Sequence, residues 1–168
     1  METETTMADL KDTFGELIRI LLRIEDAKIN IIPFTGSWTA GQLGQHVILS
    51  AGGVVELING PVTDTKRDPE ENIPNLKAVF LDFSTKMKSP EFIVPEFKNY
   101  NKAALSTRLE EIKNHLLESI STLDTSKTCT LYEFPGSGHM TRAEAIAFTI
   151  VHTQRHVHQL SNIAKHLG

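Results

Sequence analysis

Residues 141–168 read TRAEAIAFTIVHTQRHVHQLSNIAKHLG, and this stretch decides the fold. It opens with Thr141 and, three residues later, Glu144, which is the capping-box spacing of a helix N-terminus. Apolar residues follow at intervals of three and four, from Ala145 and Phe148 to Leu160 and Ile163. The stretch therefore predicts one long amphipathic helix that runs nearly to the end of the chain.

The same periodicity predicts four more helices upstream, three of them substantial and one shorter. We expect them at residues 7–29, 39–59, 76–83 and 102–123. Residues 89–100 carry two prolines and are expected to be an extended connection, and residues 128–139 a loop with at most a short strand. Four substantial helices without a convincing sheet predict an all-α four-helix bundle, formed by a single domain over residues 1–168.

The composition is that of an ordinary globular chain of 168 residues, with 40% apolar and 23% charged residues. The formal net charge is −4 and no dense Lys/Arg stripe occurs, so we expect no nucleic-acid partner. Arg19 and Arg23 interrupt a long apolar run, so we expect no membrane span. An acidic, polar beginning and a single cysteine, Cys129, favour a cytoplasmic location.

Within the last predicted helix, His152 and His156 lie four residues apart, so both imidazoles leave one face, one turn apart. That spacing allows two ligands on one helix to hold one metal ion. At about 100° per residue, both histidines fall within the apolar arc of the helix, about 40° from each other. His158 falls among polar residues and His166 near the helix end, so neither is expected to be a ligand.

The second predicted helix offers a third imidazole, His46. It lies at the edge of the face that carries Leu43, Val47, Val54 and Leu57. Buried imidazoles need partners, and three that converge can be satisfied together by one metal ion. Three histidines with an open fourth position form a catalytic type of site for Zn²⁺ or a similar ion. Alternatively, the three are unrelated core histidines, each bonded to a backbone carbonyl or a neighbouring side chain.

Four further residues carry weaker indications. Gln159 shares the face of His152, either as a residue that orients a ligand or as a polar residue at the edge of the bundle. Trp38 is interpreted first as a packing residue at a helix start and second as a residue at the site mouth. His139 lies in a Gly-rich loop that could approach the site, and His115 on a helix face of mixed exposure.

Taken together, these features resemble the DinB/YfiT-like superfamily. The resemblance spans essentially the whole chain and rests on three features: a Pro-containing loop after the first helix, Trp38-Thr39 leading to His46, and His152-x-x-x-His156-x-x-Gln159. It implies a four-helix bundle with a long crossover connection. It also implies a metal site formed by His46, His152 and His156, which would hold a divalent transition metal such as Ni²⁺ or Zn²⁺ with water at the open positions.

The resemblance also implies a range of activities. Members include thiol-dependent transferases and isomerases that use bacillithiol or mycothiol, and members often form homodimers. For this chain it implies a metal-dependent hydrolase or thiol S-transferase that acts on a small molecule, with a low-molecular-weight thiol as a candidate cosubstrate. No motif identifies a thiol site or a general base. The other hypothesis is a non-catalytic metal-binding or ligand-sensing bundle.

Overall fold

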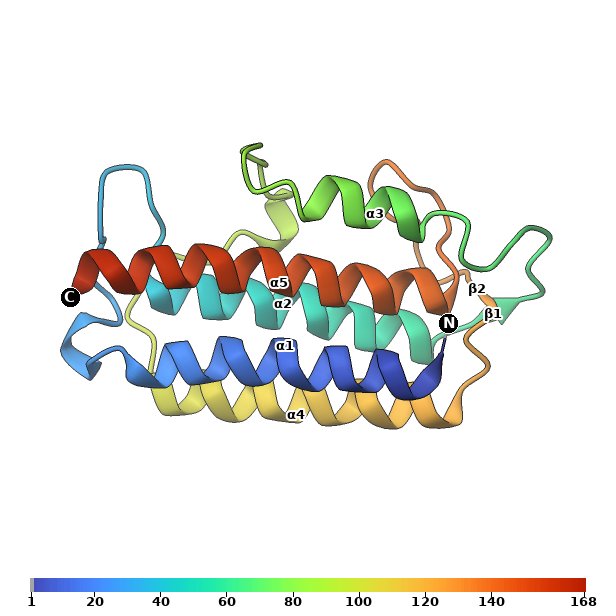
Figure 1. Cartoon of the computed structure of the whole chain (residues 1–168), viewed down its shortest axis with the longest axis horizontal. Coiled ribbons are helices and arrows are strands. Elements are labelled where there is room, and N and C mark those ends of the chain that lie inside the picture. The colour runs from blue at the N-terminus through green and yellow to red at the C-terminus, as the bar shows by residue number, and fades with distance from the viewer. Residues whose placement is uncertain (1) are drawn as a thin grey trace.

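The computed structural model, which describes residues 2–168, is a bundle of four long helices with a short fifth helix on its outside (Figure 1). The long helices are α1 (Thr3–Arg23), α2 (Ala40–Asn59), α4 (Lys102–Thr122) and α5 (Arg142–Leu167), and the short one is α3 (Ile73–Phe80). The predicted all-α bundle is therefore confirmed. Among the described helices, none is long and apolar enough to cross a membrane.

The order of the helices requires a long crossover connection. In Figure 1, α2 and α4 run in the same direction, whereas α1 and α5 run in the opposite direction. The chain must therefore return along the bundle between α2 and α4, and it uses α3 and the segment after it to do so. Each long helix packs against two others, α1 against α4 and α5, and α2 against the same pair. As a result, α2 and α5 lie side by side.

Both capping boxes predicted from the sequence are present. Thr39 and Gln42 exchange hydrogen bonds of 3.0 Å at the start of α2, which satisfies two of the free N–H groups there. Thr141 and Glu144 do the same at the start of α5. These caps fix where each helix begins and therefore which residues of α2 and α5 face each other.

Two helices, the first and the short one, begin and end at other residues than the sequence predicted. The first helix was predicted over residues 7–29, but α1 begins four residues earlier, in a polar turn with no apolar periodicity to mark it. It also ends earlier, because Lys102 of α4 donates to the carbonyls of Leu22 and Ile24, and a 3₁₀ turn, η1 (Asp26–Lys28), follows. The short helix is Ile73–Phe80 instead of 76–83, with Pro74 in its first turn.

The two connections at one end of the bundle pair as a small sheet. The first strand, β1 (Val62–Thr63), follows α2 and pairs antiparallel with β2 (Thr128–Cys129), which follows α4. The short strand expected within residues 128–139 is thus confirmed. The connection expected to be extended at 89–100 contains one 3₁₀ turn, η2 (Glu91–Ile93).

The fully buried carboxylate of Glu144 holds the crossover against the start of α5. Arg67 donates to both carboxylate oxygens at 2.6 Å, and Asn72 donates to one of them from its backbone and its side chain. Burial alone would raise the pKa of Glu144, but the hydrogen bonds from Arg67, Thr141 and Asn72 outweigh it and lower the pKa. Because Asn72 precedes α3 directly, this carboxylate fixes the start of α3 on α5.

We expect Glu144→Gln to lower the free energy of unfolding by about 2 kcal/mol, because the amide keeps the shape but loses the charge that accepts from Arg67. Urea unfolding followed by circular dichroism measures this difference. Glu118→Gln, on the exposed face of α4, is the matched control and should be close to neutral. Equal stability of the two variants would contradict the role given to Glu144.

Candidate metal centre

His46 of α2 and the pair His152 and His156 of α5 meet in the buried space between the two helices. The Nε2 atom of His152 lies 3.3 Å from Nε2 of His46 and 3.1 Å from Nε2 of His156. One nitrogen from each ring lies within 4.8 Å of the other two. His46 is only 2% exposed, His152 8% and His156 7%. The structure thus brings together the three histidines that the sequence proposed as ligands.

Local packing sets the position of His46 along α2. Besides the Thr39 cap, Gly41 permits a close approach of the chain: a Cβ there would lie 2.8 Å from Oδ1 of Asn30 and 3.0 Å from Cβ of Tyr100. Asn30 and Tyr100 hold each other by two side chain to backbone hydrogen bonds of 2.8 and 2.9 Å. The first turn of α2 is therefore fixed at two independent points, and His46 follows one and a half turns later.

The outer nitrogens of the three rings each have a partner. Nδ1 of His46 lies 2.8 Å from the carbonyl oxygen of Ile93, and Nδ1 of His156 lies 2.9 Å from Oε1 of Gln159. A carbonyl oxygen only accepts, so in both rings Nδ1 carries the proton and Nε2 keeps its lone pair. Nδ1 of His152 lies 3.4 Å from the hydroxyl of Ser50. This arrangement turns the Nε2 atoms toward one another.

The interior keeps all three imidazoles neutral at pH 7. Burial lowers the pKa of His156 to about 3, with further lowering from the neighbouring His46 and only partial compensation from the Gln159 hydrogen bond. Burial and the charges of His156 and His46 place the pKa of His152 well below its usual value. Burial also lowers the pKa of His46, against the effect of the Ile93 hydrogen bond. Neutral imidazole is the form that binds metal ions.

The spacing of the Nε2 atoms fits one bound ion. Zn–N bonds of about 2.0–2.1 Å in a tetrahedron place neighbouring nitrogens about 3.3 Å apart. The two Nε2 pairs around His152, at 3.3 and 3.1 Å, are close to that value. Lone pairs that face each other at this distance repel unless a proton or a cation lies between them. The donor set is therefore suited to a divalent transition metal, and in the described chain it contains no carboxylate or thiolate.

Aromatic rings surround the three histidines. The ring of Trp38 lies 4.9 Å from that of His46, and the rings of Phe148 and Phe80 lie 5.0 and 5.8 Å from that of His152. The half-buried Trp38 directly precedes the N-cap of α2 and contacts a candidate ligand there. Apolar walls of this kind exclude water and strengthen electrostatic interactions inside the site.

The remaining histidines lie outside the site. His158 is exposed, as predicted, and its ring stacks on Phe83 at 4.4 Å. His166 is exposed and bonds to the Asn162 carbonyl near the end of α5. His115 is exposed on α4, and His139 is exposed near Glu133. The approach of His139 to the site mouth, which its loop had suggested, is not seen.

Sequence reasoning missed two polar contacts of the site. Ser50 lies four residues after His46 on α2, so its place on the same helix face was a signal that could have been read. The contact of the Ile93 carbonyl could not be predicted from the sequence, because every residue type has the same backbone carbonyl. Gln159 accepts a hydrogen bond from His156 and therefore orients a candidate ligand, which was the first of its two interpretations.

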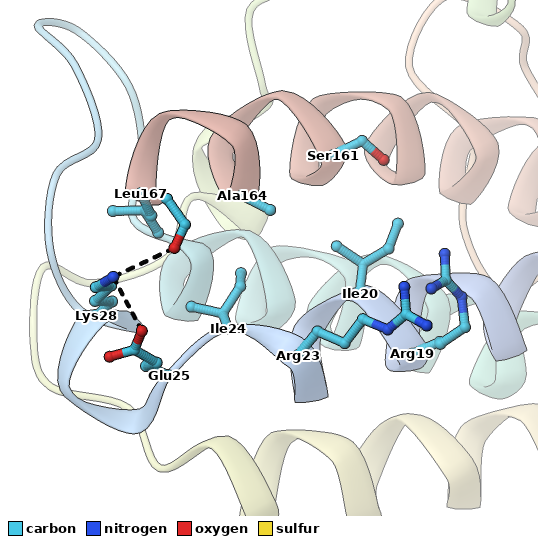
Figure 2. Close-up of a pocket in the computed structure, with 10 residues that line it drawn as sticks. Arg19, Ile20, Arg23, Ile24, Glu25, Lys28, Ser161, Ala164 and Leu167 are labelled. Atoms are coloured by element: carbon cyan, nitrogen blue, oxygen red, sulfur yellow. Dashed lines mark hydrogen bonds and ion pairs between the residues drawn. The ribbon is translucent and has the colours of Figure 1, made fainter.

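Two cavities lie elsewhere on the bundle. One, of about 310 Å³, lies between the C-terminal parts of α1 and α5, and Figure 2 shows Arg19, Arg23 and Ser161 around it. The other, of about 350 Å³, lies between α2 and α4, with Tyr100 and Arg108 in its lining. Neither of these two cavities is lined by the three histidines.

The family model of the DinB superfamily matches residues 9–160 of the chain. Together with the helical fold, this match shows that the chain belongs to the DinB superfamily, as the sequence resemblance indicated. No curated protein and no solved structure matches the chain. The family match agrees with the helical bundle, and the structure shows the group of three buried histidines.

The depressed pKa values predict that the metal-free protein loses stability as the pH falls. The unfolded chain takes up protons on these histidines near pH 6.5, and the folded chain does so only nearer pH 3 for His156. Between these values, His156 alone should lower the free energy of unfolding by up to about 1.4 kcal/mol per pH unit, and the lowered pKa values of His152 and His46 act in the same direction. Urea unfolding in chelator between pH 7 and pH 5 measures the slope.

Two variants separate this effect from the titration of carboxyl groups. His152→Gln should reduce the slope, since it removes one buried titrating group, and His115→Gln on the exposed face of α4 should leave it unchanged. Identical slopes in the native chain and in His152→Gln would contradict the assignment.

Proposed function

We propose that this chain is a divalent-metal-dependent enzyme in which His46, His152 and His156 hold one Zn²⁺ or Ni²⁺ ion through their Nε2 atoms. One observation carries the proposal: three Nε2 atoms meet in a buried space while the outer nitrogens have Ile93, Ser50 and Gln159 as partners. A metal ion satisfies all three lone pairs together. Isolated core histidines would instead turn these nitrogens to separate partners.

The electrostatics of the site favour an anionic ligand at the open position. Three neutral imidazoles leave the 2+ charge of an ion uncompensated, and the charged side chain that acts on His152 and His156 is the cation Arg155. The bound ion would lower the pKa of a coordinated water or thiol. Hydroxide and thiolate are the anions that such a site would favour, which supports hydrolase or thiol S-transferase chemistry on a small molecule.

The chain's own residues orient and enclose the reacting position. Gln159 and the Ile93 carbonyl keep the protons on Nδ1 of their histidines, so Nε2 stays available as a ligand. Trp38, Phe80 and Phe148 exclude water around the rings. No carboxylate joins the donor group within the described residues, so the proposal assigns no general base.

The alternative is a non-catalytic metal-binding or ligand-sensing bundle, and the burial of the three histidines favours it. The two hypotheses differ in whether the ion keeps an exchangeable position. The Co²⁺-loaded protein should change its visible absorption spectrum on addition of azide or a small thiol, because the added anion replaces water at the metal. A spectrum that does not change after equilibration with either anion would contradict the enzyme and support the closed site.

The ligand assignment predicts about one divalent ion per chain by elemental analysis of protein purified without an affinity tag. His152→Ala should lose the ion, because two remaining ligands hold it poorly. His158→Ala is the matched control, since this exposed histidine lies on the same helix, and it should retain full occupancy. Unchanged occupancy in His152→Ala would rule out the proposed ligand set.

Two expectations from the sequence belong to this proposal as well: the family resemblance implies a homodimer, and the composition favours a cytoplasmic location. We propose a homodimer and a cytoplasmic location. Light scattering on the purified chain and fractionation of cells test them independently of the metal.

A further inference from the structure

We propose that residues 80–93, here named the lid segment, gate the three-histidine site, and that Arg155 of α5 holds this segment closed. The inference rests on the proposed function for its purpose, but the contacts that carry it are independent of the ion. In Figure 1 the chain leaves α3 outside the bundle and turns back toward α2 and α5 before it continues to α4. Its contacts with His152 and His46 place the lid segment against the three histidines.

Both ends of the lid segment touch candidate ligands. The ring of Phe80 lies 5.8 Å from that of His152, edge-on, and packs in the same way on Phe148 at 5.1 Å. At the other end, the carbonyl of Ile93 accepts from Nδ1 of His46 at 2.8 Å. The segment thus contacts one candidate ligand from each helix. Its displacement would uncover His152 and would free the outer nitrogen of His46.

Arg155 fastens the first part of the lid segment to α5. Its guanidinium donates to the carbonyls of Phe80 at 3.3 Å and Asp82 at 2.8 Å, and also to that of Thr85. The Phe80 carbonyl ends α3, where helix carbonyls lack partners and a cation is favourable. Because Arg155 directly precedes His156, the residue that holds the lid segment and the candidate ligand are neighbours in sequence.

The rest of the lid segment has little to hold it. Every residue from 81 to 94 is exposed or half-buried, and Phe92 is 73% exposed. The side chain of Asp82 shapes the turn by accepting from Ser84 and Thr85, but these contacts stay within the segment. A segment with few buried apolar contacts opens at low cost. The lid segment is thus held on the bundle by the hydrogen bonds of Arg155, by the Phe83 ring stacked on His158 at 4.4 Å and by the Ile93–His46 hydrogen bond, and Arg155 alone donates to three of its carbonyls.

The test measures how fast diethyl pyrocarbonate modifies His46 and His152 in the metal-free full-length chain, mapped by tandem mass spectrometry of peptides. In the native chain both should react far more slowly than the exposed His115. Arg155→Gln removes the charged donor and should speed both reactions about tenfold or more, with His115 unchanged. Arg155→Lys, which keeps a cation with fewer directed bonds, should fall between the two.

A second measurement uses the Zn²⁺-loaded chain. Arg155→Gln should release Zn²⁺ to a chelator faster than the native chain, and hydrogen exchange of amides 81–93 should accelerate in parallel. Arg108→Gln, an exposed residue of α4, is the matched control and should change neither rate. Unchanged modification of His46 and His152 in Arg155→Gln would overturn the gate, as would faster amide exchange without faster modification. A native chain that binds no Zn²⁺ would contradict the proposed function, whereas the modification rates would still decide the gate.

Discussion

Three imidazole Nε2 atoms meet in one buried space between α2 and α5, where the lone pairs of His46 and His156 face Nε2 of His152 and need a proton or a cation beside them. The surroundings maintain this condition. Burial lowers the pKa of each imidazole, so protonation is opposed. Partners on the outer nitrogens prevent two of the rings from turning their lone pairs away. One metal ion would satisfy all three Nε2 atoms while every imidazole stays neutral.

The bundle maintains this arrangement through a short series of contacts. The cap at Thr141 and Glu144 starts α5, and the same Glu144 carboxylate holds Arg67 and Asn72 of the crossover. Asn72 begins α3, and α3 in turn places Phe80 beside His152. One buried carboxylate thus positions both the helix that carries two histidines and the helix that covers them. This double role explains why a charge is retained in the interior, where burial by itself is unfavourable.

Much of the fold and the site could be predicted from periodicity. The spacing of apolar residues fixed the long helices, and the one-turn interval of His152 and His156 placed them together on an inward face. The position of His46 followed from the same geometry, and the DinB resemblance added that it reaches the pair. The features that could not be predicted depend on contacts between segments that are distant in the sequence. The end of α1 is set by Lys102 of α4, and the partner of His46 is a backbone carbonyl of the crossover.

The proposed function requires that the three Nε2 atoms bind one ion. X-ray absorption spectroscopy at the metal edge of the loaded protein measures this most directly, since imidazole ligands give a distinctive multiple-scattering pattern. We predict three imidazole nitrogens at about 2.0–2.1 Å, together with at least one oxygen from exchangeable water. Fewer than three imidazoles, or a sulfur or carboxylate ligand from the chain, would contradict the account.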